Sequence, residues 1–146
     1  MADTHKAYTH KAWRLHAHND LRFEDVETPK PAADGVVVAI EAGMVLSYTG
    51  KVLSGSVPYS LPPMPFVPGT NALARVVAVG NDVTHVRAGD RVFLSPHRRG
   101  DVPALAAAGL LDLRKIVVTK FRLADFRQAV DDAALMQGLD LTAVVP

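Results

Sequence analysis

The side chains best suited to metal or nucleophilic chemistry are histidines, because the chain has six histidines and no cysteine. Without cysteine there is no disulfide, no thiolate zinc site and no thiol nucleophile. His16 and His18 would share one face of a strand, where they could form a metal pair. The alternative is that both rings face solvent, and no His-x-x-x-His or Cys/His array supports a metal site. We therefore predict no bound metal.

Composition indicates one compact domain. The chain has 146 residues, of which 49% are hydrophobic, and its formal net charge is +1 with acids and bases interspersed. This balance argues against a nucleic-acid groove and against a membrane surface. The apolar runs fall short of the ~20 residues that span a bilayer, and the polar, histidine-rich start does not look like a secretory signal. We expect a cytoplasmic protein.

The first two thirds of the chain are predicted to be strands separated by turns. Asn19-Asp20, Asp34-Gly35, Gly80-Asn81-Asp82 and Gly89-Asp90 are turn sequences. The runs between them are short and rich in β-branched residues, which favours an antiparallel sheet or barrel. We predict strands over residues 11–18, 21–26, 36–42, 74–79 and 91–94. The near-repeat Thr-His-Lys-Ala-Tyr/Trp at the start indicates a leader over residues 1–10, which we expect to be poorly ordered.

The last third reads as alternating helix and strand. Asp101 and Pro103 fit the start of a short helix over residues 104–110, and residues 114–121 and 141–145 read as strands. Residues 123–136 have the period of an amphipathic helix. Its predicted inward positions are Phe126, Ala129, Val130, Ala133 and Ala134, and its predicted outward positions are Arg127, Asp131 and Asp132.

One ordered set of motifs resembles a known family. A loop with Pro65, Pro68 and Gly69 leads into an apolar strand ending in Val79-Gly80, and Gly-Asp-Arg-Val follows at residues 89–92. This order resembles the GroES-like catalytic domain of medium-chain dehydrogenases/reductases, and residues 101–146 resemble the C-terminal piece of the same domain. The resemblance implies a mainly β fold with flanking helices, a partly open antiparallel β-barrel. It would be one domain built from residues 11–97 and 101–146, joined at 98–100.

The resemblance also bears on metal and cofactor. Zinc-dependent members carry His-Glu after the loop glycine, where this chain has Thr70 and Asn71, and a cysteine where it has Leu46. The chain therefore resembles the zinc-free branch of quinone oxidoreductases and enoyl or alkenal reductases. No Gly-x-Gly-x-x-Gly occurs, so the nucleotide-binding Rossmann domain of the family has no counterpart here. NAD(P)H is implied for a full-length relative, and we expect none bound by this chain, whether the domain was lost naturally or by design.

Two functions stay open. In the first, the chain is the substrate side of an oxidoreductase, with a pocket formed by Leu46, Ser47, Tyr48, Thr49, Thr70 and Asn71. Its ligand would be a small hydrophobic carbonyl, quinone or enone, with Tyr48 as candidate proton donor. Equally, Tyr48 could be a packed aromatic, and Thr70 and Asn71 could cap the loop. In the second, the chain is a non-catalytic module that binds an apolar ligand or forms a homodimer through exposed apolar surface.

Overall fold

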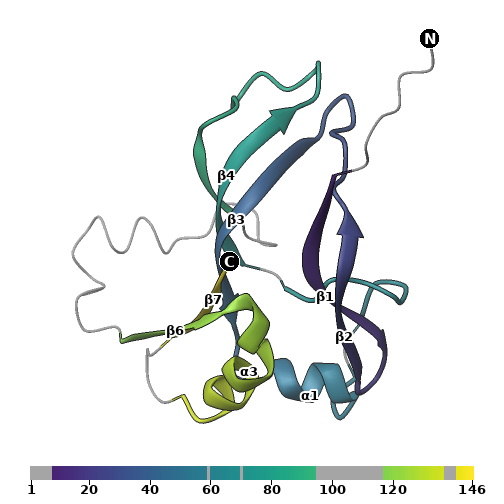
Figure 1. Ribbon diagram of the computed structural model, residues 1–146, viewed down its shortest axis with the longest axis vertical. Coiled ribbons are helices and arrows are strands. Elements are labelled where there is room, and N and C mark those ends of the chain that lie inside the picture. The colour runs from purple at the N-terminus through teal and green to yellow at the C-terminus, as the bar shows by residue number, and fades with distance from the viewer. Residues whose placement is uncertain (1–7, 59, 70, 95–116, 137–140) are drawn as a thin grey trace.

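A computed structural model describes residues 8–58, 60–69, 71–94, 117–136 and 141–146 of the chain. In this part the strands form two sheets, one with two strands and one with five (Figure 1). Three of the features expected above lie outside the described residues: the helix over 104–110, the junction at 98–100 and the side chain of Thr70.

The two-stranded sheet is an antiparallel hairpin of β1 (Thr9–Ala17) and β2 (Asp20–Glu27). Asn19 turns the chain with a φ of 65°, a left-handed conformation that asparagine tolerates better than most residues. Thr9 and His10, predicted to belong to the leader, are part of β1, where they pair with Glu27 and Val26. The hairpin register therefore extends past the predicted start of the strand at residue 11.

The five-stranded sheet has the order β5-β4-β3-β7-β6. Its strands are β3 (Val36–Val45), β4 (Ala72–Val79), β5 (Arg91–Leu94), β6 (Val118–Arg122) and β7 (Leu141–Val145). All neighbours are antiparallel except β6 and β7, which run parallel. β7 pairs with β3 and β6 pairs with β7, so the C-terminal strands complete the sheet formed by the first part of the chain. The predicted mainly β, GroES-like fold is confirmed, and the described sheets do not close into a barrel.

Helices occupy one end of the molecule (Figure 1). Within the described residues these helices are α1 (Thr49–Ser54), the 3-10 turn η2 (Leu123–Asp125) and α3 (Phe126–Ala134). Phe126, Ala129 and Ala133 of α3 are buried as predicted. The prediction was wrong for Ala134, which is exposed, and for Asp132, which is half-buried because it accepts a hydrogen bond from the Thr142 hydroxyl at 2.7 Å. None of the described helices has the length and hydrophobicity that a bilayer span needs.

The core joins the two ends of the sequence. Leu15 and Leu21 of the hairpin pack with Leu53 of α1 and with Phe126 and Ala129 of α3. Leu15 and Ala129 are completely shielded from solvent. Burial of these side chains supplies the main favourable free energy at this end of the fold. The same packing fixes the hairpin against α1 and α3, and so positions one wall of the cleft described next.

Candidate functional site

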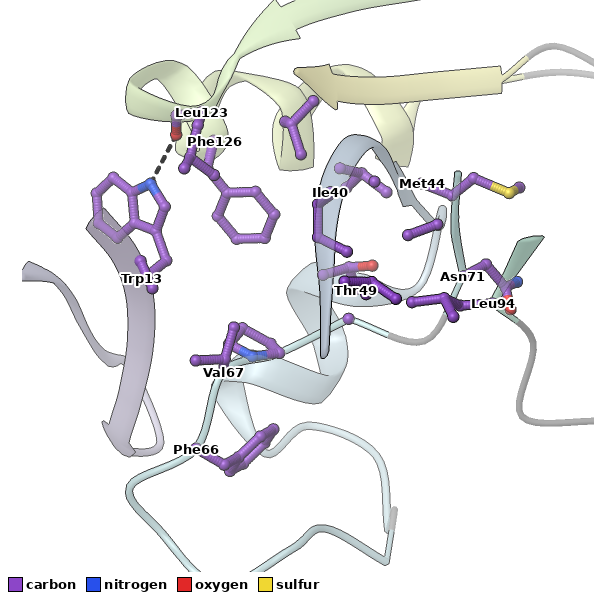
Figure 2. A pocket seen from close by; sticks show the side chains of 18 of the residues that line it. Trp13, Ile40, Met44, Thr49, Phe66, Val67, Asn71, Leu94, Leu123 and Phe126 are labelled. Carbon is purple, nitrogen blue, oxygen red and sulfur yellow. Dashed lines mark hydrogen bonds between the residues drawn. The ribbon is translucent and has the colours of Figure 1, made fainter. Parts of the chain in front are cut away.

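A cleft with a volume of about 930 Å³ opens between the hairpin and the five-stranded sheet. Its wall draws on segments far apart in the sequence: β1, β3, α1, the loop over residues 60–69, η2 and the last residues of β7. Figure 2 shows Trp13, Leu123 and Phe126 on one side and Asn71 on the other, beside Met44 and Leu94, with Ile40 and Thr49 between the two sides. A deep, mostly apolar cleft with few polar groups is the usual form of a small-molecule site.

The segment between β3 and α1 supplies the polar end of the cleft. The backbone N–H of Leu46 donates a hydrogen bond to the Thr49 hydroxyl at 3.1 Å, which fixes the turn into α1. Gly55 ends this helix with a φ of 73°, and its position against the His18 ring leaves no room for a larger residue. The turn places Leu46, Tyr48 and Thr49 in the cleft wall.

Tyr48 stands at the N-cap position of α1 and is 42% exposed. Its hydroxyl makes no side-chain capping bond to the helix. A half-exposed phenol in a cleft wall can donate a hydrogen bond to a carbonyl oxygen of a ligand. Ser47, which we also expected in the pocket, is exposed and is not among the residues that line the cleft.

Asn71 is the most informative polar residue of the cleft. Its backbone carbonyl accepts a hydrogen bond from the Met44 N–H at 3.0 Å, which ties the start of β4 to β3. Its side-chain Oδ1 is buried and has no hydrogen-bond partner among the residues that the structure describes. A buried amide oxygen without a partner costs roughly 1–3 kcal/mol, so the arrangement is unfavourable unless a further group satisfies it. Thr70, the neighbouring expected site residue, lies outside the described part of the chain.

The aromatic wall was missed by the sequence interpretation. The ring of Trp13 lies 5.1 Å from Phe23 and 6.1 Å from Phe126, measured between centroids, and Arg127 lies over its face at 5.3 Å. Trp13 also donates a hydrogen bond to the carbonyl oxygen of Leu123. The one available signal was that Trp13 is the only tryptophan in the chain, in a segment assigned to the leader and the first strand.

The main ion pairs lie away from the polar end of the cleft. Arg91 and Arg75 both contact Glu41, with the Arg91 Nε 2.6 Å and the Arg75 Nη2 3.0 Å from its carboxylate oxygens. The hydrogen bond from Arg91 is the chief cause that lowers the pKa of Glu41, and Arg75 adds to it. On the hairpin, His16 lies 3.1 Å from Glu24, and its hydrogen bond is the chief cause that lowers the pKa of Glu24. These groups stabilise strands and are not cleft residues.

The side chains at the expected zinc position differ from those that bind zinc. Zinc sites use thiolate, imidazole and carboxylate ligands. The cleft presents the alkyl side chain of Leu46 and the amide of Asn71 near the positions that the resemblance assigns to zinc-dependent members. Among the described residues, no three histidine, aspartate or glutamate side chains lie close enough to hold a metal ion together. The described cleft residues therefore do not fit zinc.

The glycine-containing turns differ from those that bind the pyrophosphate of a dinucleotide. A pyrophosphate binds to backbone amides at a helix N-terminus that follows a strand and a glycine-rich turn. Gly35, Gly80 and Gly89 lie in turns that connect strands. In the part of the chain that the structure describes, these turns therefore lack the arrangement that binds a dinucleotide.

Comparison with known proteins decides the family. The alcohol dehydrogenase GroES-like domain matches residues 32–110, which include β3, α1, β4 and β5. The chain belongs to this family. The GroES-like domain is found in medium-chain dehydrogenases/reductases, so the resemblance recognised from the motifs is confirmed.

Individual relatives cover part of the chain. An alcohol dehydrogenase of Moraxella sp. (strain TAE123) is 39% identical over 72 residues, 49% of this chain and 21% of the relative. The chloroplastic quinone-oxidoreductase QR1 of Triphysaria versicolor is 33% identical over 73 residues, 49% of this chain and 22% of that protein. The GroES-like chain thus spans only about a fifth of the length of these curated relatives.

Solved structures agree with this assignment. The Escherichia coli quinone oxidoreductase, solved in complex with NADPH, is 30% identical with a TM-score of 0.50, over 57% of this chain and 26% of that chain. An alcohol dehydrogenase superfamily protein from Novosphingobium aromaticivorans is 31% identical with a TM-score of 0.53, over 59% of this chain and 26% of that one. The chain is therefore part of the GroES-like catalytic domain of this oxidoreductase family.

Proposed function

We propose that this GroES-like chain is the substrate-binding part of an NAD(P)H-dependent oxidoreductase that reduces a small apolar carbonyl, quinone or enone without zinc. One observation carries the proposal: the wall of the apolar cleft includes the polar side chains of Tyr48, Thr49 and Asn71, with Leu46 where zinc-dependent members have a cysteine. Similarity to both alcohol dehydrogenases and a quinone oxidoreductase supports the reaction class.

The cleft residues would bind and orient the ligand. The apolar wall excludes water and holds the hydrocarbon part, which burial favours by about 25 cal/mol per Å². The Tyr48 hydroxyl would donate a hydrogen bond to the ligand oxygen. The same hydroxyl would supply a proton to the ligand oxygen as the carbonyl or enone is reduced. The hydride itself is the contribution of NAD(P)H in the complete enzyme.

The single tryptophan makes ligand binding measurable. Trp13 lines the cleft, so a quinone that occupies it should quench the emission excited at 295 nm in a saturable way. The chain has no cysteine, so a quinone cannot form a thiol adduct that would imitate binding. We expect 1,4-naphthoquinone to bind saturably, and linear, non-saturating quenching would argue against the proposal.

A matched pair of tyrosine variants tests the role of the hydroxyl. Tyr48→Phe removes only the oxygen at the cleft, and we expect a threefold to tenfold weaker naphthoquinone affinity, on the order of one hydrogen bond. Tyr8→Phe makes the same change at a tyrosine that is 78% exposed and does not line the cleft, and it should bind like the wild type. Equal losses in both variants, or no loss in either, would remove Tyr48 from the proposal.

The alternative is a non-catalytic binding module, favoured by the absence of a dinucleotide cradle among the described residues. Calorimetry of the chain with NADH and NADPH, together with reductase assays on the same ligands, separates the two. Turnover with either cofactor supports an enzyme. Naphthoquinone binding without turnover, even when a nucleotide-binding domain of a relative is fused to the chain, supports the module.

A further inference from the structure

The cleft extends along β3, beyond the polar side chains of Thr49 and Asn71. Residues of β3 from Val36 to Val45 contribute to its wall, and the strand is 10 residues long, which corresponds to roughly 30 Å. The head of a small carbonyl compound would occupy only the part beside Thr49 and Asn71. Most of the cleft therefore lies beyond the group that the proposed reaction needs.

The polarity of the wall changes along this length. Thr49 and Asn71 lie by the C-terminal end of β3, where the Thr49 hydroxyl accepts a hydrogen bond from the Leu46 N–H and the Asn71 carbonyl accepts one from the Met44 N–H. The earlier residues of the strand that line the cleft, from Val36 to Ile40, are all apolar. Ile40 and Val67 line the cleft and remain 41% and 52% exposed, although side chains of this kind gain free energy from burial. A cleft with one polar end and a long apolar part matches a molecule that has the same asymmetry.

The polar side chains at the far end are already occupied. His10 Nδ1 lies 3.2 Å from the Thr28 hydroxyl, and the Lys11 ammonium donates a hydrogen bond to Asp25 at 2.7 Å. Both pairs lie at the exposed surface of the hairpin. These groups therefore do not call for a second polar group on the ligand, and a hydrocarbon chain can pass them towards solvent.

We propose that the ligand is an amphiphile: a quinone or enone head beside Thr49 and Asn71, with a linear hydrocarbon tail that lies along β3 between the two sheets. The head rests on the proposed function, and the tail rests on the length and polarity of the cleft. Along the tail, Trp13 and Phe66 would contact one side and Ile40 the other.

A homologous series measures the tail directly. The ligands are 2-alkyl-1,4-benzoquinones with tails from one to twelve carbons, kept below their micelle concentrations and followed by quenching of Trp13. Each buried methylene should improve affinity about threefold to fourfold, until the tail reaches solvent and the gain stops. An affinity that does not change with tail length overturns the inference and leaves the proposed function standing.

One variant is directed at the tail and a matched variant serves as control. Ile40→Glu places a carboxylate in the apolar part, and it should abolish the gain per methylene while the one-carbon ligand binds as before. Val118→Glu makes a similar change at a β-branched residue of β6 that is 44% exposed and lies outside the cleft wall. It should keep the full chain-length dependence. Equal behaviour of the two variants would place the tail elsewhere and overturn the inference.

A competition experiment tests the tail site with ligands that lack a quinone head. Displacement of the dye 1-anilinonaphthalene-8-sulfonate by straight-chain alcohols reports on the tail without a quinone. If the benzoquinones fail to bind but dodecanol displaces the dye far better than butanol, the tail site stands and the proposed reaction falls. If neither class shows a dependence on chain length, the tail site falls. Circular dichroism of both variants verifies that they are folded.

Discussion

The indole Nε1 of Trp13 donates a hydrogen bond of 2.8 Å to the carbonyl oxygen of Leu123, a residue 110 positions away. This bond ties the N-terminal hairpin to the turn that begins the C-terminal helix, at the edge of the cleft. Arg127 reinforces the contact, because it lies over the indole ring and donates a hydrogen bond to the Leu21 carbonyl at 2.7 Å. One wall of the candidate site therefore depends on both ends of the chain.

Replacing Trp13 by phenylalanine tests this connection. Trp13→Phe keeps an aromatic ring but loses the N–H and weakens the cation–π contact, so we expect about 1–2 kcal/mol less stability. Urea unfolding followed by circular dichroism measures the change. Tyr8→Phe, at an exposed aromatic residue, is the control and should leave the unfolding midpoint unchanged. A Trp13→Phe midpoint equal to that of the wild type would show that the bond contributes little.

Gly80 lies so close to the backbone of Ala32 and Ala33 that we predict that only glycine is tolerated there. A Cβ at this position would overlap the carbonyl oxygens of Ala32 and Ala33, and backbone cannot move aside as a flexible side chain can. We expect Gly80→Ala to lose about 3 kcal/mol or more. Gly43→Ala is the matched control, because its Cβ would meet only Val144 at an ordinary 3.5 Å. Similar thermal midpoints for the two variants would contradict this interpretation.

The pair of arginines around Glu41 predicts a dependence of stability on pH. The hydrogen bond from Arg91 is the main cause that holds the pKa of Glu41 below its usual 4.5 in the folded protein. A lowered folded-state pKa gives stability that is present above the unfolded-state pKa and is lost as the pH falls through the folded-state value. The stability difference between wild type and Glu41→Gln should therefore be present near neutral pH and shrink below about 4.5. Arg91→Gln, which keeps the carboxyl but removes its main partner, should reduce the same difference. A stability difference between wild type and Glu41→Gln that grows as the pH falls would contradict this prediction.

Self-association is expected through the exposed edge of the larger sheet. Phe93 on the edge strand β5 is 63% exposed, and exposed apolar side chains on an edge favour pairing with a second copy. We expect a concentration-dependent homodimer in sedimentation equilibrium, and weaker association for Phe93→Ser. Tyr8→Ser removes an aromatic side chain that is 78% exposed and lies outside this sheet edge, and it should not change association. A strict monomer at all concentrations would rule out the homodimer.

Local signals predicted most of the individual elements. The bounds of β5 and β7 were predicted correctly, because they depend on turn residues and short apolar runs. Of the strand predicted over residues 114–121, residues 114–116 lie outside the described part of the chain. β6 runs from Val118 to Arg122, one residue beyond the predicted end, because its pairing with β7 extends to Arg122. The error at Asp132 arises because the Thr142 hydroxyl of β7 donates a hydrogen bond to its carboxylate, and Ala134, the other error, is the last residue of α3.

The cleft was only partly predictable, for a physical reason. Leu46, Tyr48, Thr49 and Asn71 are contributed by one continuous region that the family motifs identify, and they do line the cleft. The opposite wall is formed by Trp13, Leu123 and Phe126, which meet only after the C-terminal segment packs on the hairpin. Neither periodicity nor turn sequences carry information about a contact of that range.

The most direct test of the proposed ligand site is a two-dimensional 1H–15N NMR titration of the labelled chain with 1,4-naphthoquinone. The account predicts saturable shifts of the Thr49 and Asn71 amides and of the Trp13 indole N–H, because all three residues line the cleft. The amides of Asp82 and Lys120, which lie outside its wall, should stay in place. Shifts confined to surface residues outside the cleft, or no saturable shift at all, would contradict the proposal that this cleft binds the substrate.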